Sequence, residues 1–152
     1  MRRALAIRAA LVVMIALAIG CGGRSSSPAE PAARSDSIVL LSVDPPEGTH
    51  MPLGGRVQVT ARVRYTFQQP AGGTVEVVVT PLPFGLPLLT DPLLAHVHVD
   101  GQEGEATLRF AILLDDPDHQ LHPGPIAADL FLLPQGQNQS STSVQIRYEV
   151  VP

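Results

Sequence analysis

A strict two-residue alternation over residues 56–67 is the feature that most constrains how this chain can fold. Every odd-numbered residue in this stretch is apolar and every even-numbered residue is polar. Because successive side chains of a β-strand point to opposite faces, this alternation predicts a strand with one buried and one hydrated face. Two further stretches alternate in the same way, 105–114 and 143–150, and four are shorter or less regular: 38–43, 74–80, 95–99 and 126–133. Together they predict six more strands, and none has the spacing of an amphipathic helix. The stretch 126–133 can be read with either face inward.

Turn-forming residues separate these stretches. Proline or glycine occurs at 45–48, 54–55, 70–73 and 123–125, where proline sets a turn dihedral and glycine permits a positive φ. Strands with one apolar face bury that face by pairing across two sheets. We therefore expect residues 38–152 to form an all-β, antiparallel sandwich of about seven strands.

The order of these stretches, from residues 38–55 into the strand that starts at Arg56, resembles the immunoglobulin-like or fibronectin type III-like modules of bacterial envelope proteins. The resemblance implies an immunoglobulin-like β-sandwich. The chain has no Trp and one Cys, so the buried Trp and paired cysteines of antibody-type domains are missing. Its core is expected to use Val and Leu together with Phe67, Phe110 and Tyr148.

The N-terminus has the three-part layout of a secretory signal peptide. Arg2, Arg3 and Arg8 precede an apolar run at 9–19, which is shorter than the roughly 20 residues of a membrane-spanning helix. Residues 18–21, Ala-Ile-Gly-Cys, resemble the lipobox of bacterial lipoproteins. This resemblance implies that residues 1–20 are removed and that Cys21 is acylated, for example with palmitate, and becomes the first residue.

The lipoprotein resemblance also implies a location in the cell envelope. Gly22 follows the cysteine, where Asp typically signals inner-membrane retention, so the outer membrane is implied for a Gram-negative cell. Residues 21–37 are rich in Gly, Ser, Pro and Ala and predict a flexible linker from the lipid anchor. Removal of residues 1–20 takes the formal net charge from −4 to about −7, which disfavours nucleic acid as a partner.

Histidines suggest one alternative function, metal binding. His96 and His98 lie two residues apart on a predicted strand, so both imidazoles share a face, as in Zn²⁺ or Cu²⁺ sites on sheets. His119 and His122, in an acidic loop, are further candidate ligands. The simpler interpretation is that all four belong to hydrated strand faces and turns.

The sequence favours a protein that is not an enzyme and needs no cofactor. It lacks Gly-x-Ser-x-Gly, and it has no glycine-rich phosphate loop that opens a helix. Glu103 and Glu105 share one strand edge and are the candidate acid and base. A charged strand end that keeps the sheet from aggregating explains the same pattern.

Residues 80–94 combine four prolines with seven large apolar residues. Proline prevents a regular interior strand, so one interpretation is a crossover between the sheets that lays its leucines over an open edge. The other is an exposed docking surface for an envelope protein, with Leu82, Phe84 and Leu86 as contact residues. The main functional hypothesis is a lipid-anchored, non-catalytic binding or structural module.

Overall fold

The computed structural model of the chain describes residues 35–83, 85–88, 90–115 and 121–152. The signal peptide and most of the linker predicted from the sequence lie outside these residues, as do Cys21, Phe84 and His119. The described part is all-β and contains these strands: β1 (Ser37–Asp44), β2 (His50–Pro52), β3 (Arg56–Thr66), β4 (Gly73–Pro81), β5 (Thr90–Asp91), β6 (His96–Val99), β7 (Glu103–Leu113), β8 (Gly124–Pro134) and β9 (Thr142–Val151).

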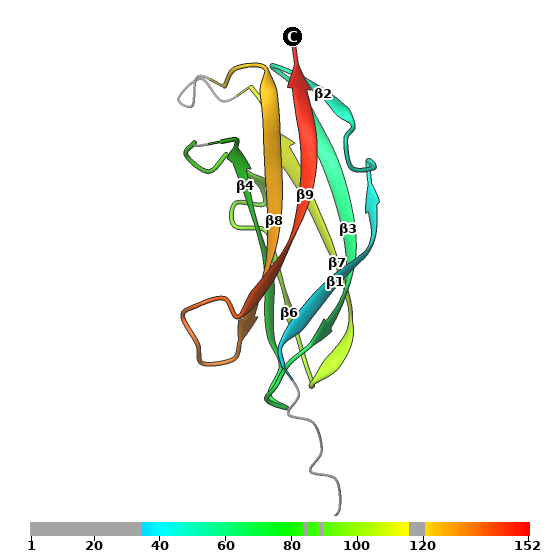
Figure 1. Cartoon of the computed structure of the whole chain (residues 1–152), viewed down its shortest axis with the longest axis vertical. Helices are drawn as coiled ribbons and strands as arrows, with labels where there is room; N and C mark the ends of the chain where they lie inside the picture. The colour runs from blue at the N-terminus through cyan, green and yellow to red at the C-terminus, as the bar shows by residue number, and fades with distance from the viewer. Residues whose placement is uncertain (1–34, 84, 89, 116–120) are drawn as a thin grey trace, which may run out of the picture. The chain divides into compact units, whose positions relative to one another are not determined.

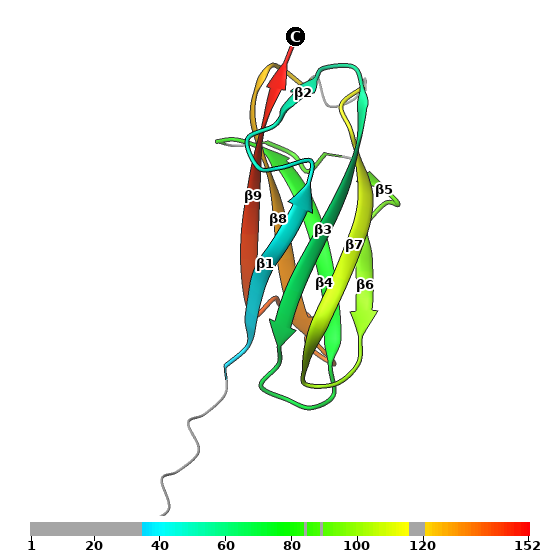
Figure 2. The same ribbon diagram turned by 90° about the vertical axis from the view of Figure 1, so that its right-hand side faces the viewer.

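The strands form two sheets, which confirms the expected two-sheet, all-β architecture (Figures 1 and 2). One sheet has the order β1-β3-β7-β5, and the other has the order β2-β9-β8-β4-β6. The seven predicted strands correspond to β1, β3, β4, β6, β7, β8 and β9. The short strands β2 and β5 were not predicted, because two or three residues are too few to show a periodicity.

One strand pair departs from the antiparallel arrangement expected from the sequence. β2 runs parallel to β9, with Met51 beside Val150, and all the other pairs among the described strands are antiparallel. The parallel pairing extends the sheet past β9 because the chain crosses from β1 to the other sheet before it enters β3. Met51 is fully buried, so this short strand closes one end of the core.

The core lies between the sheets, and the alternation in β3 explains it. The odd-numbered residues of β3 pair with even-numbered residues of β7, and both sets point inward, as with Val59 and Phe110. The polar residues between them form the outer face. The compact unit, Ala32–Pro152, contains the described strands and the buried core from Ile38 to Val150.

The ambiguous strand β8 places its even-numbered residues in the core. Ile126, Leu130 and Leu132 are buried, whereas Asp129 and Phe131 on the opposite face are only half-buried. β8 lies between β4 and β9, and Leu130 pairs with Val77 of β4. β8 is thus an interior strand of its sheet, and its even-numbered face lies in the core.

Candidate functional site

The connection between β4 and β6, residues 81–94, is the candidate functional site. It leaves the β2-β9-β8-β4-β6 sheet, pairs through β5 with β7 of the other sheet, and returns to β6 (Figure 2). It is therefore a crossover between the sheets, as one interpretation of the sequence expected. We call it the 81–94 connection.

The leucines of the 81–94 connection are not buried as a set. Leu88 is buried, and Leu82 is half-buried. In contrast, Leu86, Leu93 and Leu94 are 73%, 70% and 60% exposed. The crossover therefore leaves these three leucines largely exposed rather than buried, although Leu93 and Leu94 line a hollow beside β4.

Backbone hydrogen bonds fasten the 81–94 connection to the sandwich. The N–H of Leu82 donates to the carbonyl oxygen of Pro125 at 2.8 Å, and the N–H of Leu88 donates to that of Val79 at 2.7 Å. The hydroxyl of Thr90 donates to the carbonyl oxygen of Pro92 at 3.0 Å. These bonds fix the backbone of the connection. The three exposed leucines lie outside the paired strands.

A small apolar hollow lies beside the exposed leucines. It has a volume of about 110 Å³ and is lined by residues of β4 and of the connection: Val77, Val78, Val79, Pro87, Leu88, Thr90, Leu93 and Leu94. β6 pairs only with the first four residues of β4, from Gly73 to Glu76. The rest of that edge of β4 is therefore bordered by the connection rather than by a full strand.

The structure does not bring together the candidate metal ligands that it describes, His96, His98 and His122; His119 lies outside the described residues. His96 and His98 lie exposed on β6; Nδ1 of His96 contacts the carbonyl oxygen of Leu94 at 2.8 Å, and Nε2 of His98 lies 3.5 Å from Oδ1 of Asp100. His96 is in register with Phe131 through Glu76, whereas His122 precedes Gly124, the first residue of β8. Gly124 lies seven residues from Phe131 along the strand, a span of about 23 Å. Within the described ranges, no three His, Cys, Asp or Glu side chains form a group suited to a metal ion.

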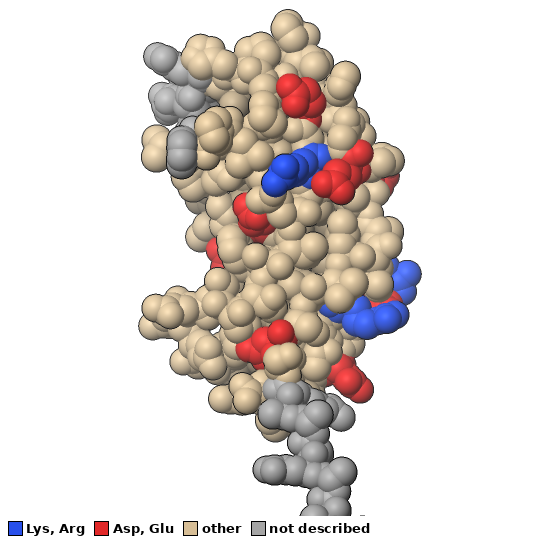
Figure 3. All heavy atoms as spheres, viewed as in Figure 1, with Lys and Arg blue, Asp and Glu red and all other residues tan. Residues whose placement is uncertain are grey.

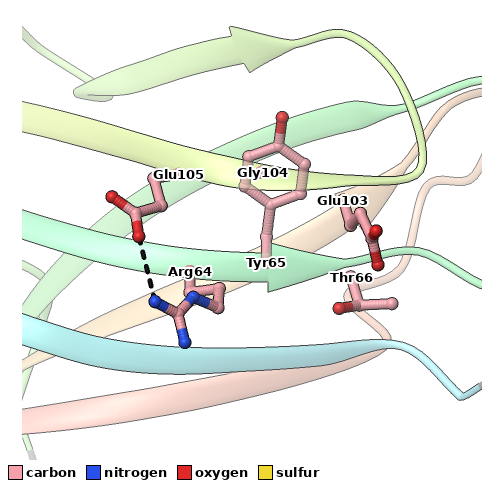
Figure 4. A pocket seen from close by; sticks show the side chains of 6 residues that line it. All are labelled: Arg64, Tyr65, Thr66, Glu103, Gly104 and Glu105. Carbon is pink, nitrogen blue, oxygen red and sulfur yellow. Dashed lines mark hydrogen bonds and ion pairs between the residues drawn. The ribbon is translucent and has the colours of Figure 1, made fainter.

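The candidate acid and base lie at one end of the β3–β7 pair, beside a shallow pocket of about 400 Å³ (Figure 4). Arg64 and Arg62 both form ion pairs with Glu105, the first at 3.1 Å. Hydrogen bonds from these two guanidinium groups lower the pKa of Glu105. The two arginines thus hold Glu105 as a carboxylate, which leaves it unsuited to be the proton donor of such a pair.

Tyr65 closes the inner side of this pocket. Figure 4 shows its ring beside Gly104, its partner on β7. A Cβ atom on Gly104 would lie only 2.7 Å from the hydroxyl oxygen of Tyr65. The tyrosine thus occupies the space that a side chain at position 104 would fill, and its hydroxyl donates to the carbonyl oxygen of Asp100 at 3.2 Å. Its role is to pack the end of the sandwich.

A further hollow, of about 440 Å³, lies where β2 meets β9 and was not predicted from the sequence. Tyr148 lines it together with Glu47, His50, Arg147 and Glu149, among others. Tyr148 is itself buried, and its hydroxyl donates to the carbonyl oxygen of Pro45 at 3.2 Å. Burial, assisted by the carboxylates of Glu47 and Asp44, raises its pKa to about 12. The sequence holds no signal for this grouping, because Pro45 and Tyr148 are 103 residues apart.

Charged side chains are sparse on the face drawn in Figure 3, where they form a few separate groups without a continuous basic surface. In the described part of the chain, no helix is long and apolar enough to cross a bilayer.

No protein-family model matches the chain, and no curated protein sequence matches it. Among solved structures, it is similar to a beta-glucosidase from Listeria innocua, with 14% identity and a TM-score of 0.45 over 76% of this chain and 16% of that chain. A b-glucosidase from Erythrobacter marinus shows 15% identity and a TM-score of 0.42 over 77% of this chain and 15% of that one.

The alkylpurine DNA glycosylase AlkC of Pseudomonas fluorescens has 14% identity and a TM-score of 0.44, over 79% of this chain and 32% of that chain. The chain thus spans about a sixth of the glucosidases and a third of the DNA glycosylase. With TM-scores below 0.5, these likenesses decide neither fold nor function.

Proposed function

We propose that this chain is a lipid-anchored protein of the cell envelope whose β-sandwich acts as a non-catalytic binding module. The observation that carries the binding role is the exposure of Leu86, Leu93 and Leu94 on the 81–94 connection. Leu93 and Leu94 are adjacent in the chain and line one apolar hollow, and exposed apolar patches of this kind mark contact surfaces. The lipobox-like residues 18–21 support acylation of Cys21, in the outer membrane if the cell is Gram-negative.

The strand order supports an immunoglobulin-like class of sandwich. Constant-type immunoglobulin domains have sheets with the strand orders A-B-E-D and C-F-G. In this chain β1-β3-β7-β5 corresponds to the first order, and β4-β8-β9 corresponds to the second. β2 and β6 extend the second sheet at its two edges. Modules of this class present their contacts on edge strands and connecting loops, in keeping with the 81–94 connection.

The ion pairs at the β3–β7 end suit a network of surface charges better than a proton donor. The two arginines that keep Glu105 ionised leave that carboxylate without a proton to give at neutral pH. The hollow next to the exposed leucines is lined mainly by apolar groups, which suits contact with an apolar surface better than proton transfer.

The lipid anchor is tested by expressing the full chain in a bacterium and measuring the mass and location of the product. We expect a chain that begins at Cys21, carries acyl groups and fractionates with membranes. The Cys21→Ser variant should lack the acyl mass and leave the membrane fraction. An unacylated wild-type chain would overturn the anchor.

The contact surface is tested by photo-crosslinking in intact cells, from a crosslinker placed in the 81–94 connection that captures protein and lipid alike. Leu86→Asp should abolish crosslinks at the 81–94 connection without lowering the melting temperature, because Leu86 is exposed. Leu53→Asp, which alters another exposed leucine, is the matched control and should leave the crosslinks in place. Equal crosslinking of both variants would contradict a contact role for the connection.

A further inference from the structure

The chemistry of the 81–94 connection limits what can cover its leucines. The few residues that carry most of the binding energy of a protein interface are enriched in Trp, Tyr and Arg, whereas Leu is under-represented among them. Residues 81–94 contain none of these three residue types and six leucines. Exposed leucines without directional partners suit a medium that offers no directional contacts, namely lipid hydrocarbon.

The backbone of the connection is also suited to an apolar medium. Backbone groups that enter hydrocarbon without a hydrogen-bond partner are costly. Pro81, Pro83, Pro87 and Pro92 have no N–H, and the N–H groups of Leu82 and Leu88 already donate to carbonyl oxygens of the sandwich. The four prolines and the two bonded N–H groups thus reduce the number of donors that would lose hydration when the leucines enter lipid.

The connection is almost free of charge. Asp91 is the only ionisable residue within 81–94, and it forms an ion pair with Arg56 of β3. The side chain of Thr90 is satisfied by the carbonyl oxygen of Pro92. Insertion of the leucines therefore does not require an unpaired charge to leave water.

Leu94 shows that local strain accompanies this exposure. Its φ is +55°, the only positive φ found at a non-glycine residue in the described part of the chain. This left-handed conformation is unfavourable for a residue with a Cβ atom, yet the side chain remains 60% exposed. Strained residues of this kind are concentrated at sites of contact and function.

We infer that the 81–94 connection inserts Leu86, Leu93 and Leu94 into the surface of a zwitterionic lipid bilayer. The domain thus has a membrane contact of its own, separate from Cys21. The acidic net charge disfavours anionic lipid, so the contact is apolar and insensitive to salt.

The proposed anchor at Cys21 supports this inference, and this support alone rests on the proposed function. Residues 22–37 span about 50 Å when extended, and an eleven-residue strand such as β3 spans about 36 Å. The linker is therefore long enough for the connection to reach the bilayer that holds the anchor.

The test uses the unit Ala32–Pro152, which contains the described strands and their core and lacks Cys21. Because the chain has no Trp, Leu93→Trp provides a single fluorescent reporter at an exposed position. With phosphatidylcholine vesicles we expect its emission to shift to the blue and to be quenched by brominated lipid. Val39→Trp, at an exposed residue of β1, is the matched control and should show neither effect.

A flotation assay with the same vesicles supplies an independent measurement. The double variant Leu86→Ser, Leu93→Ser should lower the partition coefficient by at least about tenfold, with an unchanged melting temperature and unchanged binding on addition of salt. Absence of vesicle binding by the wild-type unit, binding restricted to anionic vesicles, or equal binding by the double variant would each overturn the inference.

A second copy of the chain is the competing occupant, and sedimentation distinguishes it. Dimers that form with rising concentration and are lost in the double variant would assign the leucines to self-association and overturn the lipid contact. Because the unit lacks Cys21, failure of this test leaves the anchor to be decided by the mass of the full chain.

Discussion

At the residue scale, Tyr148 connects β9 to the turn that follows β1. Its side chain is among the largest that are fully buried, and its hydroxyl donates to the carbonyl oxygen of Pro45. Burial raises its pKa from 10 to about 12, and the nearby carboxylates of Glu47 and Asp44 act in the same direction. The fold therefore stabilises the protonated phenol.

This pKa predicts how stability depends on alkaline pH. Because the folded-state pKa is raised, the contribution is complete below pH 10 and is lost as the pH rises from 10 to about 12. Urea unfolding between pH 9 and pH 12 should show this loss, and Tyr148→Phe should flatten it while it costs about 1 kcal/mol at neutral pH. The same alkaline slope in the variant would contradict the assignment.

Gly72 gives a second prediction at this scale. Its φ is +77°, and a Cβ atom would lie 2.3 Å from the carbonyl oxygen of Val99. Gly72→Ala should therefore lower the free energy of unfolding by more than about 2 kcal/mol, from the backbone conformation and the clash together. Gly101 has a φ of +81° and open space around it, so Gly101→Ala is the matched control. Denaturant unfolding should show the smaller loss for the control, and equal losses would exclude the clash.

At the scale of single elements, Leu94 of the 81–94 connection lowers the stability of the fold while its exposed side chain is available for the proposed lipid contact. The left-handed conformation of Leu94 costs about 1–2 kcal/mol for a residue with a Cβ atom, and Asn tolerates this conformation better. Its side chain is nevertheless exposed, so packing within the domain does not explain the leucine.

Leu94→Asn should therefore move two properties in opposite directions. We expect the free energy of unfolding to rise by up to about 1 kcal/mol, because the strain falls, and the affinity for phosphatidylcholine vesicles to fall, because an exposed leucine is removed. Thermal melting and vesicle flotation measure the two changes. A variant that is less stable and binds vesicles equally well would show that Leu94 only supports the fold.

At the scale of the whole molecule, the burial of β8 depends on strands from distant parts of the sequence. Leu130 points into the core, and Phe131 faces outward. Leu130→Ala should lower the free energy of unfolding by about 2–5 kcal/mol through loss of packing. Phe131→Ala removes a larger side chain from a half-buried position and should cost less. The order of the two denaturant midpoints checks this, and the reverse order would mean that β8 has the opposite face inward.

The two-residue alternation was sufficient to predict most strands and the all-β class. In a strand with one buried face, such as β3, the alternation of apolar and polar residues itself indicates which side chains meet water. The short β2 and β5 were missed because their pairing depends on crossovers between the sheets rather than on local pattern. The parallel pairing of β2 with β9 has no sequence signal for the same reason.

Prediction of the candidate site was partial. The proline content of residues 80–94 correctly indicated a connection between sheets rather than a strand, since proline lacks the donor that a ladder needs. Composition could not decide which leucines are buried. That depends on where the N–H groups of Leu82 and Leu88 find acceptors on other strands. The histidines suggested one site, but distance along β8 separates His122 from His96 and His98.

The sequence alone determined the class of the domain and the approximate position of its longer strands, and it contains the lipobox-like pattern around Cys21. Each of these depends only on local spacing or local composition. The tertiary structure decided which face of β8 is buried, which leucines of the 81–94 connection are exposed on the domain, and how Tyr148 comes to lie beside Pro45. These features arise from contacts between residues far apart in the chain, and such contacts leave no periodicity in the segments they join.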